Sequence, residues 1–167
     1  MGRSNAGKSS AINAITHRHG LARTSKTPGR TRLLNFFELG PNQRIVDLPG
    51  YGYASGPEVE RLTWQPLIDA LKPRESLRGV FMIVDSRRGL TEADGALLAW
   101  ASGLRVHVLL SKADKLNRSE AAKVLRETKA AIGDGVTAQL FSVPAKTGID
   151  EAQRTLEAWL DARAPRP

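Results

Sequence analysis

GRSNAGKS, residues 2–9, is the stretch that decides the fold. It fits the pattern G-x-x-x-x-G-K-[ST], in which two glycines let the backbone curl so that successive N–H groups face inward and hold an anion. Lys8 would reach the terminal phosphates of a nucleotide, and the Ser9 hydroxyl would bind Mg²⁺. Apolar residues at helical spacing follow at once, so a helix N-terminus points at the same anion: Ala11, Ile12, Ala14 and Ile15. The stretch predicts a phosphate-binding loop; the alternative is a glycine-rich turn that matches by chance.

A buried strand normally runs into such a loop, but here only Met1 precedes Gly2. We therefore expect that the chain begins late and lacks the first strand of its sheet. Loss of a central parallel strand would leave backbone groups of its neighbours without partners.

Composition limits the classes of protein that the chain can belong to. Its 167 residues predict one domain, residues 1–163, with a frayed tail at residues 164–167. The absence of cysteine excludes disulfides and cysteine-based metal sites. No apolar run of membrane-spanning length and no signal peptide are visible, so we expect a cytoplasmic protein with no membrane partner. The net charge of +8 favours a polyanionic partner, although a basic surface without a partner is the alternative.

Strand and helix patterns alternate along the chain. Short, nearly continuous apolar runs are typical of parallel strands that are covered on both faces. The patterns predict strands over residues 32–39, 44–48, 79–87, 105–112 and 137–143, and helices over residues 57–71, 91–102, 118–132 and 149–162. Thr91 and Asp94 resemble a capping box, and Pro66 should kink or split its helix. The expected architecture is α/β, with a mostly parallel sheet flanked by helices.

Polar residues at the carboxyl ends of the strands point to a nucleotide, because ligands of open α/β sheets bind there. Asp47 can hold Mg²⁺ through water, and the Gly50 N–H can reach a γ-phosphate. Asp114 can accept hydrogen bonds from the N1–H and N2–H₂ edge of guanine, whereas adenine would leave it unpaired. The Lys112 stem can lie over the purine plane.

Two further segments fit this site. Backbone N–H groups of Ser142 and Val143 could reach guanine O6, and Thr31, in a long polar loop, could add a hydroxyl to Mg²⁺. Each residue also has a plainer interpretation. The aspartates could be helix caps, Lys112 a solvated charge, and Ser142 a turn residue.

Five segments together resemble the EngB family of bacterial ribosome-assembly GTPases: GRSNAGKSS, TSKTPGRT, DLPGYGYA, SKAD and FS. The resemblance spans nearly the whole chain. It implies a Ras-like P-loop GTPase fold, GTP or GDP with Mg²⁺, a role in assembly of the large ribosomal subunit, and a requirement in cell division and septation. Motif by motif, it implies nucleotide contacts at Gly2, Arg3, Ser4, Asn5, Ala6, Gly7, Lys8, Ser9, Gly29, Arg30, Thr31, Arg32, Leu33, Asp47, Leu48, Pro49, Gly50, Ser111, Lys112, Ala113, Asp114, Phe141, Ser142 and Val143, with Ser9 and Thr31 as metal ligands.

Besides the expected late start, the chain departs from the family pattern at two places, and from Ras-type enzymes at a third. Ser111 stands where asparagine or threonine is frequent; a polar side chain remains, so we expect little loss. Val143 and Pro144 stand where small polar residues are usual, and Pro144 has no N–H to offer. Tyr51 occupies the position at which Ras-type enzymes carry a water-orienting glutamine.

No catalytic base replaces that glutamine, so we predict slow intrinsic hydrolysis and leave the catalytic residue unassigned. Asn5 and Arg30 are candidates. Asn5 matches an asparagine that, in related GTPases, helps place a K⁺ ion beside the phosphates; otherwise it only braces the loop. Arg30 could compensate charge or be a solvated residue of the first switch.

Cationic residues in and before the first switch could meet ribosomal RNA: Arg18, Arg23, Lys26, Arg30 and Arg32, with His17 and His19 when protonated. The leading hypothesis is a monomeric GTP hydrolase switch that acts on a precursor of the large ribosomal subunit. A GTP-sensing docking module with incidental hydrolysis is the second hypothesis. An ATP-dependent small-molecule kinase is the third, against which SKAD argues.

Overall fold

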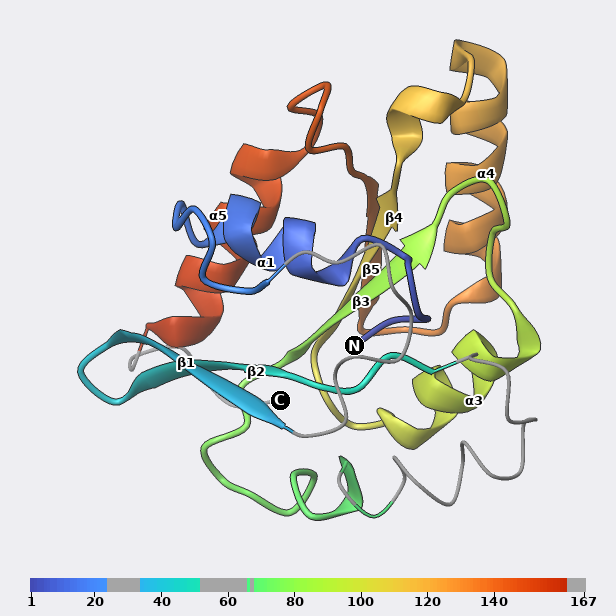
Figure 1. Cartoon of the computed structure of the whole chain (residues 1–167). Helices are drawn as coiled ribbons and strands as arrows, with labels where there is room; N and C mark the ends of the chain where they lie inside the picture. Colours follow the sequence, from blue (N-terminus) through green and yellow to red (C-terminus); the bar gives the residue numbers. More distant parts are fainter. Residues whose placement is uncertain (24–33, 52–65, 67, 162–167) are drawn as a thin grey trace.

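A parallel sheet with helices on both faces forms the centre of the molecule (Figure 1). The computed structural model describes residues 1–23, 34–51, 66 and 68–161. The sheet has the order β3-β4-β5, with β3 at Val80–Asp85, β4 at Val106–Ser111 and β5 at Val136–Leu140. All six residues of β4 are buried, which is why this run is almost continuously apolar. The predicted strands 79–87, 105–112 and 137–143 are confirmed, each with slightly different ends.

A separate antiparallel hairpin lies beside this sheet. It joins β1 (Asn35–Gly40) to β2 (Gln43–Asp47), with Phe37 opposite Ile45. Asn42 turns the chain in the left-handed region, with φ of 59°, a conformation that asparagine tolerates better than most residues. The two predicted strands are confirmed, although residues 32 and 33 of the first lie outside the described residues.

The first residues of the chain lie between the hairpin and the parallel sheet. Gly2 forms a parallel bridge with Ile83, and Arg3 forms one with Tyr51. The Ile83 N–H donates to the Met1 carbonyl at 2.8 Å, and the Ser4 N–H donates to the Tyr51 carbonyl at 2.7 Å. We expected a missing strand to leave its neighbours without partners; at this end of the sheet, residues 1–4 supply those partners.

Helices of the described residues lie on both faces of the parallel sheet (Figure 1). On one face lie α1 (Lys8–Ile15) and α5 (Ile149–Leu160), and Gln153 of α5 donates to the Ala14 carbonyl at 3.1 Å. On the other lie α3 (Glu92–Trp100) and α4 (Arg118–Ala131). Each face has its own apolar core. The first includes Ala11, Ile15, Ile83, Leu109 and Ala152, and the second Met82, Val84, Leu97, Val108 and Leu110.

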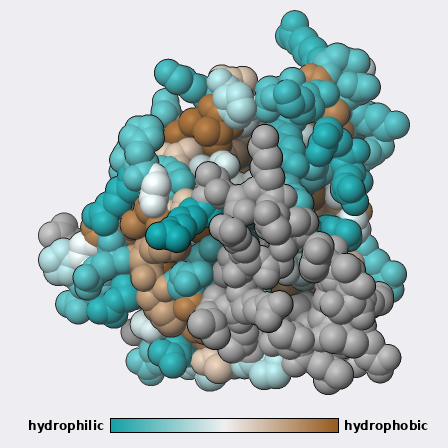
Figure 2. All heavy atoms as spheres, viewed as in Figure 1, coloured by the Kyte–Doolittle hydropathy of each residue, from teal (hydrophilic) through white to brown (hydrophobic). Residues whose placement is uncertain are grey.

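The helix starts follow their sequence signals. Thr91 and Asp94 form the predicted capping box of α3, and Asn117 with Glu120 forms another at α4. Only Thr128 of helix α4 is fully buried. The side chains that α4 presents to solvent are mainly hydrophilic (Figure 2).

Parts of the prediction fall outside the described residues. Of the predicted helix 57–71, only residues 66 and 68–71 are described; residues 66, 68 and 69 are helical. The tail at residues 164–167 is not described. Across the described ranges, no helix is long and apolar enough to cross a membrane.

Candidate nucleotide-binding site

The phosphate loop curls as its sequence predicts. Asn5 and Gly7 adopt left-handed backbone angles, with φ of 62° and 95°, and α1 begins directly after Gly7. Gly2 is required for a different reason: a Cβ there would lie 2.7 Å from the Ile83 carbonyl oxygen, closer than real Cβ contacts allow. The loop is therefore pressed against β3 while its curled part opens at the start of a helix, the arrangement that binds phosphate.

Lys8 of the loop and Asp47 at the end of β2 form an ion pair. The Nζ–Oδ1 distance is 2.5 Å, and the two side chains are only 10% and 4% exposed. Two residues 39 positions apart in sequence thus meet at the place where phosphate and Mg²⁺ were expected.

The segment that follows Asp47 runs back along the phosphate loop. Leu48 is buried, whereas Pro49 and Gly50 are half-buried. A Cβ on Gly50 would lie 3.1 Å from the Ser4 backbone, so glycine allows the two segments to approach closely.

Tyr51 is buried, and its hydroxyl donates to the Asp94 carboxylate of α3. Asp94 also accepts from the Thr91 N–H at 2.8 Å and the Thr91 hydroxyl at 2.7 Å. Burial and the adjacent Asp94 carboxylate raise the pKa of Tyr51 well above its usual range. The residue at the glutamine position is therefore a neutral phenol held against α3.

Ser111, at the end of β4, fastens the phosphate loop to the sheet. Its hydroxyl lies 2.5 Å from the Ala6 carbonyl oxygen and 3.0 Å from that of Val84. Because Ser111 is 3% exposed, these contacts are shielded from water. The Ser111 side chain thus binds the backbone of the phosphate loop at Ala6.

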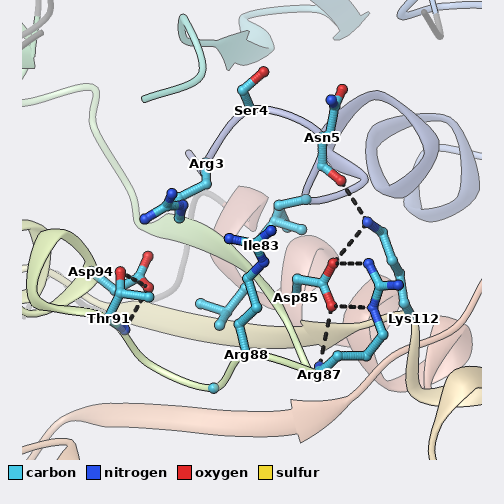
Figure 3. Close-up of a pocket in the computed structure, with 13 residues that line it drawn as sticks. Arg3, Ser4, Asn5, Ile83, Asp85, Arg87, Arg88, Thr91, Asp94 and Lys112 are labelled. Carbon is cyan, nitrogen blue, oxygen red and sulfur yellow. Dashed lines mark hydrogen bonds and ion pairs between the residues drawn. The ribbon is translucent and has the colours of Figure 1, made fainter. Parts of the chain in front are cut away.

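Lys112 spans the gap between the loop and β3 (Figure 3). Its ammonium donates to the Asn5 carbonyl at 2.6 Å and to Asp85 Oδ2 at 2.8 Å. Arg87 forms a fork on the same carboxylate, at 2.9 Å and 2.6 Å. Burial opposes ionisation of Asp85, but the hydrogen bonds from Arg87 and Lys112 hold its pKa well below its usual range.

Asp85 and Arg87 were missed by the sequence reasoning. The available signal was that Asp85 ends a predicted strand, at the same edge of the sheet as Asp114 and Ser142.

Asp114 lies in η1 (Ala113–Lys115), a single 3-10 turn after β4. The Ser142 hydroxyl donates to Asp114 Oδ1 at 2.6 Å, and Lys115 lies 3.3 Å from Oδ2. The hydrogen bond from Ser142 lowers the pKa of Asp114, against a smaller opposing effect of burial. Asp114 is thus an ionised, oriented acceptor.

The segment after β5 differs from expectation at Ser142. Its N–H donates to the Thr147 carbonyl at 3.0 Å in an antiparallel bridge, so it does not face a base; the Ser142 hydroxyl instead orients Asp114. No backbone bond among the described residues uses the Val143 N–H. Phe141 is 1% exposed and packs in the core under α1 and α5. Ala113 donates its N–H to the Phe141 carbonyl at 3.2 Å, which ties η1 to this segment.

The predicted first-switch residues lie outside the described residues: Gly29, Arg30, Thr31, Arg32 and Leu33. Ser9 lies in the first turn of α1, next to Lys8. Within the described part of the chain, no three His, Asp or Glu side chains gather as a metal site. The metal pair Ser9 and Thr31 therefore stays a prediction.

Comparison with known proteins matches this geometry. The family profile described as "50S ribosome-binding GTPase" matches residues 1–112. The "Probable GTP-binding protein EngB" of Coxiella burnetii (strain CbuK_Q154) is 48% identical over 168 residues, covering 97% of this chain and 82% of the relative.

Two solved structures share the fold at low identity. Aquifex aeolicus Era bound to GDP and AlF₄⁻ has a TM-score of 0.70 and 19% identity, over 99% of this chain and 56% of that one. Era in complex with MgGDPNP and nucleotides 1506–1542 of 16S ribosomal RNA gives 0.70 and 19%, over 98% and 56%.

The phosphate loop, the parallel sheet flanked by helices and the family match agree with one another. They confirm the predicted P-loop GTPase fold, GTP binding and GTPase activity. The chain belongs to the EngB family of GTP-binding proteins.

Proposed function

We propose that this GTPase is a nucleotide-dependent switch in assembly of the large ribosomal subunit, and that it thereby supports normal cell division and septation. The family profile, described as "50S ribosome-binding GTPase", supports the large-subunit part of this proposal. Contact with RNA is supported by the shared fold of Era, which has been solved with a segment of 16S ribosomal RNA, and by the net charge of +8. A partner of this kind implies action in the cytoplasm, as a monomer that binds a subunit precursor through its RNA.

The main support for guanine binding is the cluster at the ends of β4 and β5, which consists of Lys112, Asp114 and Ser142. The ionised Asp114 would accept from the two donors of the guanine edge, and the Val143 N–H would donate to O6. The Lys112 stem would lie over the purine plane. Adenine offers no such donor pair, so Asp114 would remain unpaired and ATP would be rejected.

The donor set at the phosphate end fits Mg²⁺, which prefers hard oxygen ligands. The Ser9 hydroxyl and the Thr31 hydroxyl would hold the ion, with Asp47 acting through water. Lys8 would bind the terminal phosphates. Bound Mg²⁺ would neutralise charge on those phosphates.

Hydrolysis by this arrangement is slow, because Tyr51 carries no group that can take or orient a proton at neutral pH: its phenol is held by Asp94 and its pKa is raised. Asn5 would help place K⁺ beside the phosphates, and Arg30 is the other candidate for charge compensation. The anchored Tyr51 also favours a second function, a GTP-sensing docking module in which hydrolysis is incidental.

Binding and docking are tested together. Fluorescent GTP and ATP analogues are titrated with Mg²⁺ present, and we expect GTP to bind at least ~100-fold more tightly than ATP. Sedimentation with large-subunit precursors should then retain the protein with a non-hydrolysable GTP analogue and release it with GDP. Equal retention with both nucleotides would contradict the switch.

Hydrolysis separates the two functions. Single-turnover rates are measured with and without precursor particles, in K⁺ and in Na⁺. A rate that rises on the particles supports the hydrolase switch, whereas an unchanged rate supports the docking module. Equal rates in K⁺ and Na⁺ would exclude the role of Asn5 in placing K⁺.

A further inference from the structure

A hollow of about 240 Å³ lies between the phosphate loop and the segment that joins β3 to the start of α3 (Figure 3). Its charged lining consists of Arg3, Arg87, Arg88, Lys112, Asp85 and Asp94. It is not lined by the side chains that would bind the terminal phosphates, the metal and the guanine edge: Lys8, Ser9, Asp47 and Asp114. It is lined by other residues that the family resemblance assigns to the nucleotide: Arg3, Ser4, Asn5, Ala6 and Lys112. The hollow is therefore a different space from the proposed nucleotide site, although the two share the phosphate loop and Lys112.

Both carboxylates of the hollow are already engaged. Asp94 accepts from Tyr51 and Thr91, and Asp85 accepts from Arg87 and Lys112. Across the described residues, neither Arg3 nor Arg88 forms an ion pair. Figure 3 shows both of these side chains directed into the hollow without a dashed contact. Four cations face two committed carboxylates, so the hollow keeps an excess of positive charge.

This charge is presented in a form that suits phosphate. Guanidinium groups donate in a planar fork that matches phosphate oxygens, and charge-assisted hydrogen bonds of this kind are about twice as strong as neutral ones. Arg88 is exposed, so an anion can reach it from solvent. Arg3 is half-buried, so its charge is partly shielded from water. At about 240 Å³ the hollow is below the roughly 300–1,000 Å³ of sites for drug-sized ligands, and a single phosphate group fits it better than a whole nucleotide.

We propose that this hollow is a second phosphate-binding site, which takes a backbone phosphate of RNA through Arg88 and Arg3. The net charge of +8 favours a polyanion over an isolated ion, because each neutralised phosphate releases counterions. The RNA assignment rests on the proposed function. It adds a contact on the α3 side of the phosphate loop.

The test uses the full chain, a fluorescein-labelled single-stranded RNA of mixed sequence, and anisotropy titrations with a non-hydrolysable GTP analogue present. Arg88→Ala is compared with Arg126→Ala, an exposed arginine of α4 whose loss changes the net charge by the same amount. We expect Arg88→Ala to weaken RNA binding by about fivefold to tenfold, and to reduce the slope of log K against log salt by about 0.7. Arg126→Ala should weaken binding by less than about twofold.

Equal affinities and salt slopes for the two variants would overturn the proposal. So would competition by polyglutamate that equals competition by RNA at the same charge concentration, because the hollow would then be a site for acidic peptide. Urea unfolding and binding of fluorescent GTP are measured on each variant. Both should match the wild type, since Arg88 is exposed and its side chain forms no ion pair with a described residue.

The same data separate this inference from the proposed function. If ribosomal particles retain the protein in a GTP-dependent way but RNA binding does not need Arg88, the second site is wrong and the switch stands. If RNA binding needs Arg88 but the particles do not respond to GTP, the switch is wrong and the site stands.

Discussion

The ion pairs of Asp85 allow a direct test of how Lys112 is held. Asp85→Asn preserves the size of the side chain and removes its charge. Lys112 then keeps its hydrogen bond to the Asn5 carbonyl but loses the charged partner that lies 2.8 Å from its ammonium. If this carboxylate holds Lys112 in the position proposed for stacking on guanine, the variant should release bound nucleotide faster.

The size of the effect follows from burial. The Asp85 side chain is 10% exposed and that of Lys112 is 31% exposed, so water screens their attraction only in part. Hydrogen bonds to charged groups contribute about 1.5–3 kcal/mol, and the asparagine oxygen retains part of this. A loss of about 1–1.4 kcal/mol remains, which corresponds to GDP dissociation that is about fivefold to tenfold faster.

The assay is displacement of a fluorescent GDP analogue in a stopped-flow instrument, with urea unfolding measured in parallel. Arg87→Ala is the matched control, because it removes the other cation from Asp85 and leaves Lys112 in place. Since the Arg87 side chain is 50% exposed, we expect its loss to change GDP dissociation by less than about twofold. Identical dissociation rates for the two variants would refute the reasoning, as would a wild-type rate for Asp85→Asn.

Three further predictions follow from other contacts. Asp114→Asn should weaken GTP binding by more than ~100-fold and favour xanthosine triphosphate, whose C2 carbonyl accepts a hydrogen bond; competition titrations measure both. Gly148→Ala should lower the free energy of unfolding by at least about 2 kcal/mol in urea, because φ is +70° and the new Cβ would lie 2.3 Å from both Gln139 Nε2 and the Leu140 oxygen. Burial lowers the pKa of His107 from its usual 6.5 despite the hydrogen bond with Gln139, so the unfolded chain binds the extra proton. Stability should therefore fall as the pH drops below about 6.5, and His107→Gln should lose that part of the pH dependence of the urea midpoint.

Much of the fold could be predicted because its signals are local. The runs at 79–87 and 105–112 are short and almost wholly apolar. This pattern is typical of a strand that is covered on both faces. The Thr91–Asp94 capping box is likewise visible within four residues. The rule that ligands bind at the carboxyl ends of parallel strands was enough to group Lys112 with Asp114 and Ser142.

The rest depends on contacts between distant residues. Lys112 and Asn5 are 107 positions apart, and the distance of 2.6 Å between them depends on how two loops pack. Asp85 could have been an ordinary strand-ending residue, since nothing near it in sequence shows that both Arg87 and Lys112 bind it. The Ser142 N–H was assigned to guanine because the sequence does not reveal its bridge to Thr147.

Tyr51 shows why a position in a motif does not by itself give a role. Its N–H donates to the Gly2 carbonyl and its carbonyl accepts from Ser4, so the backbone is bound to the phosphate loop. Its hydroxyl is bound to Asp94 at the start of α3. A shift of Gly50 toward a γ-phosphate must therefore either carry α3 with it or break a buried hydrogen bond to a charged group, at a cost of about 1.5–3 kcal/mol. Tyr51 thus links Gly2 and Ser4 of the phosphate loop to Asp94 of α3, the helix that borders the hollow proposed as a second phosphate site. A residue held in this way is not free to turn and orient water, so we expect slow turnover of bound GTP.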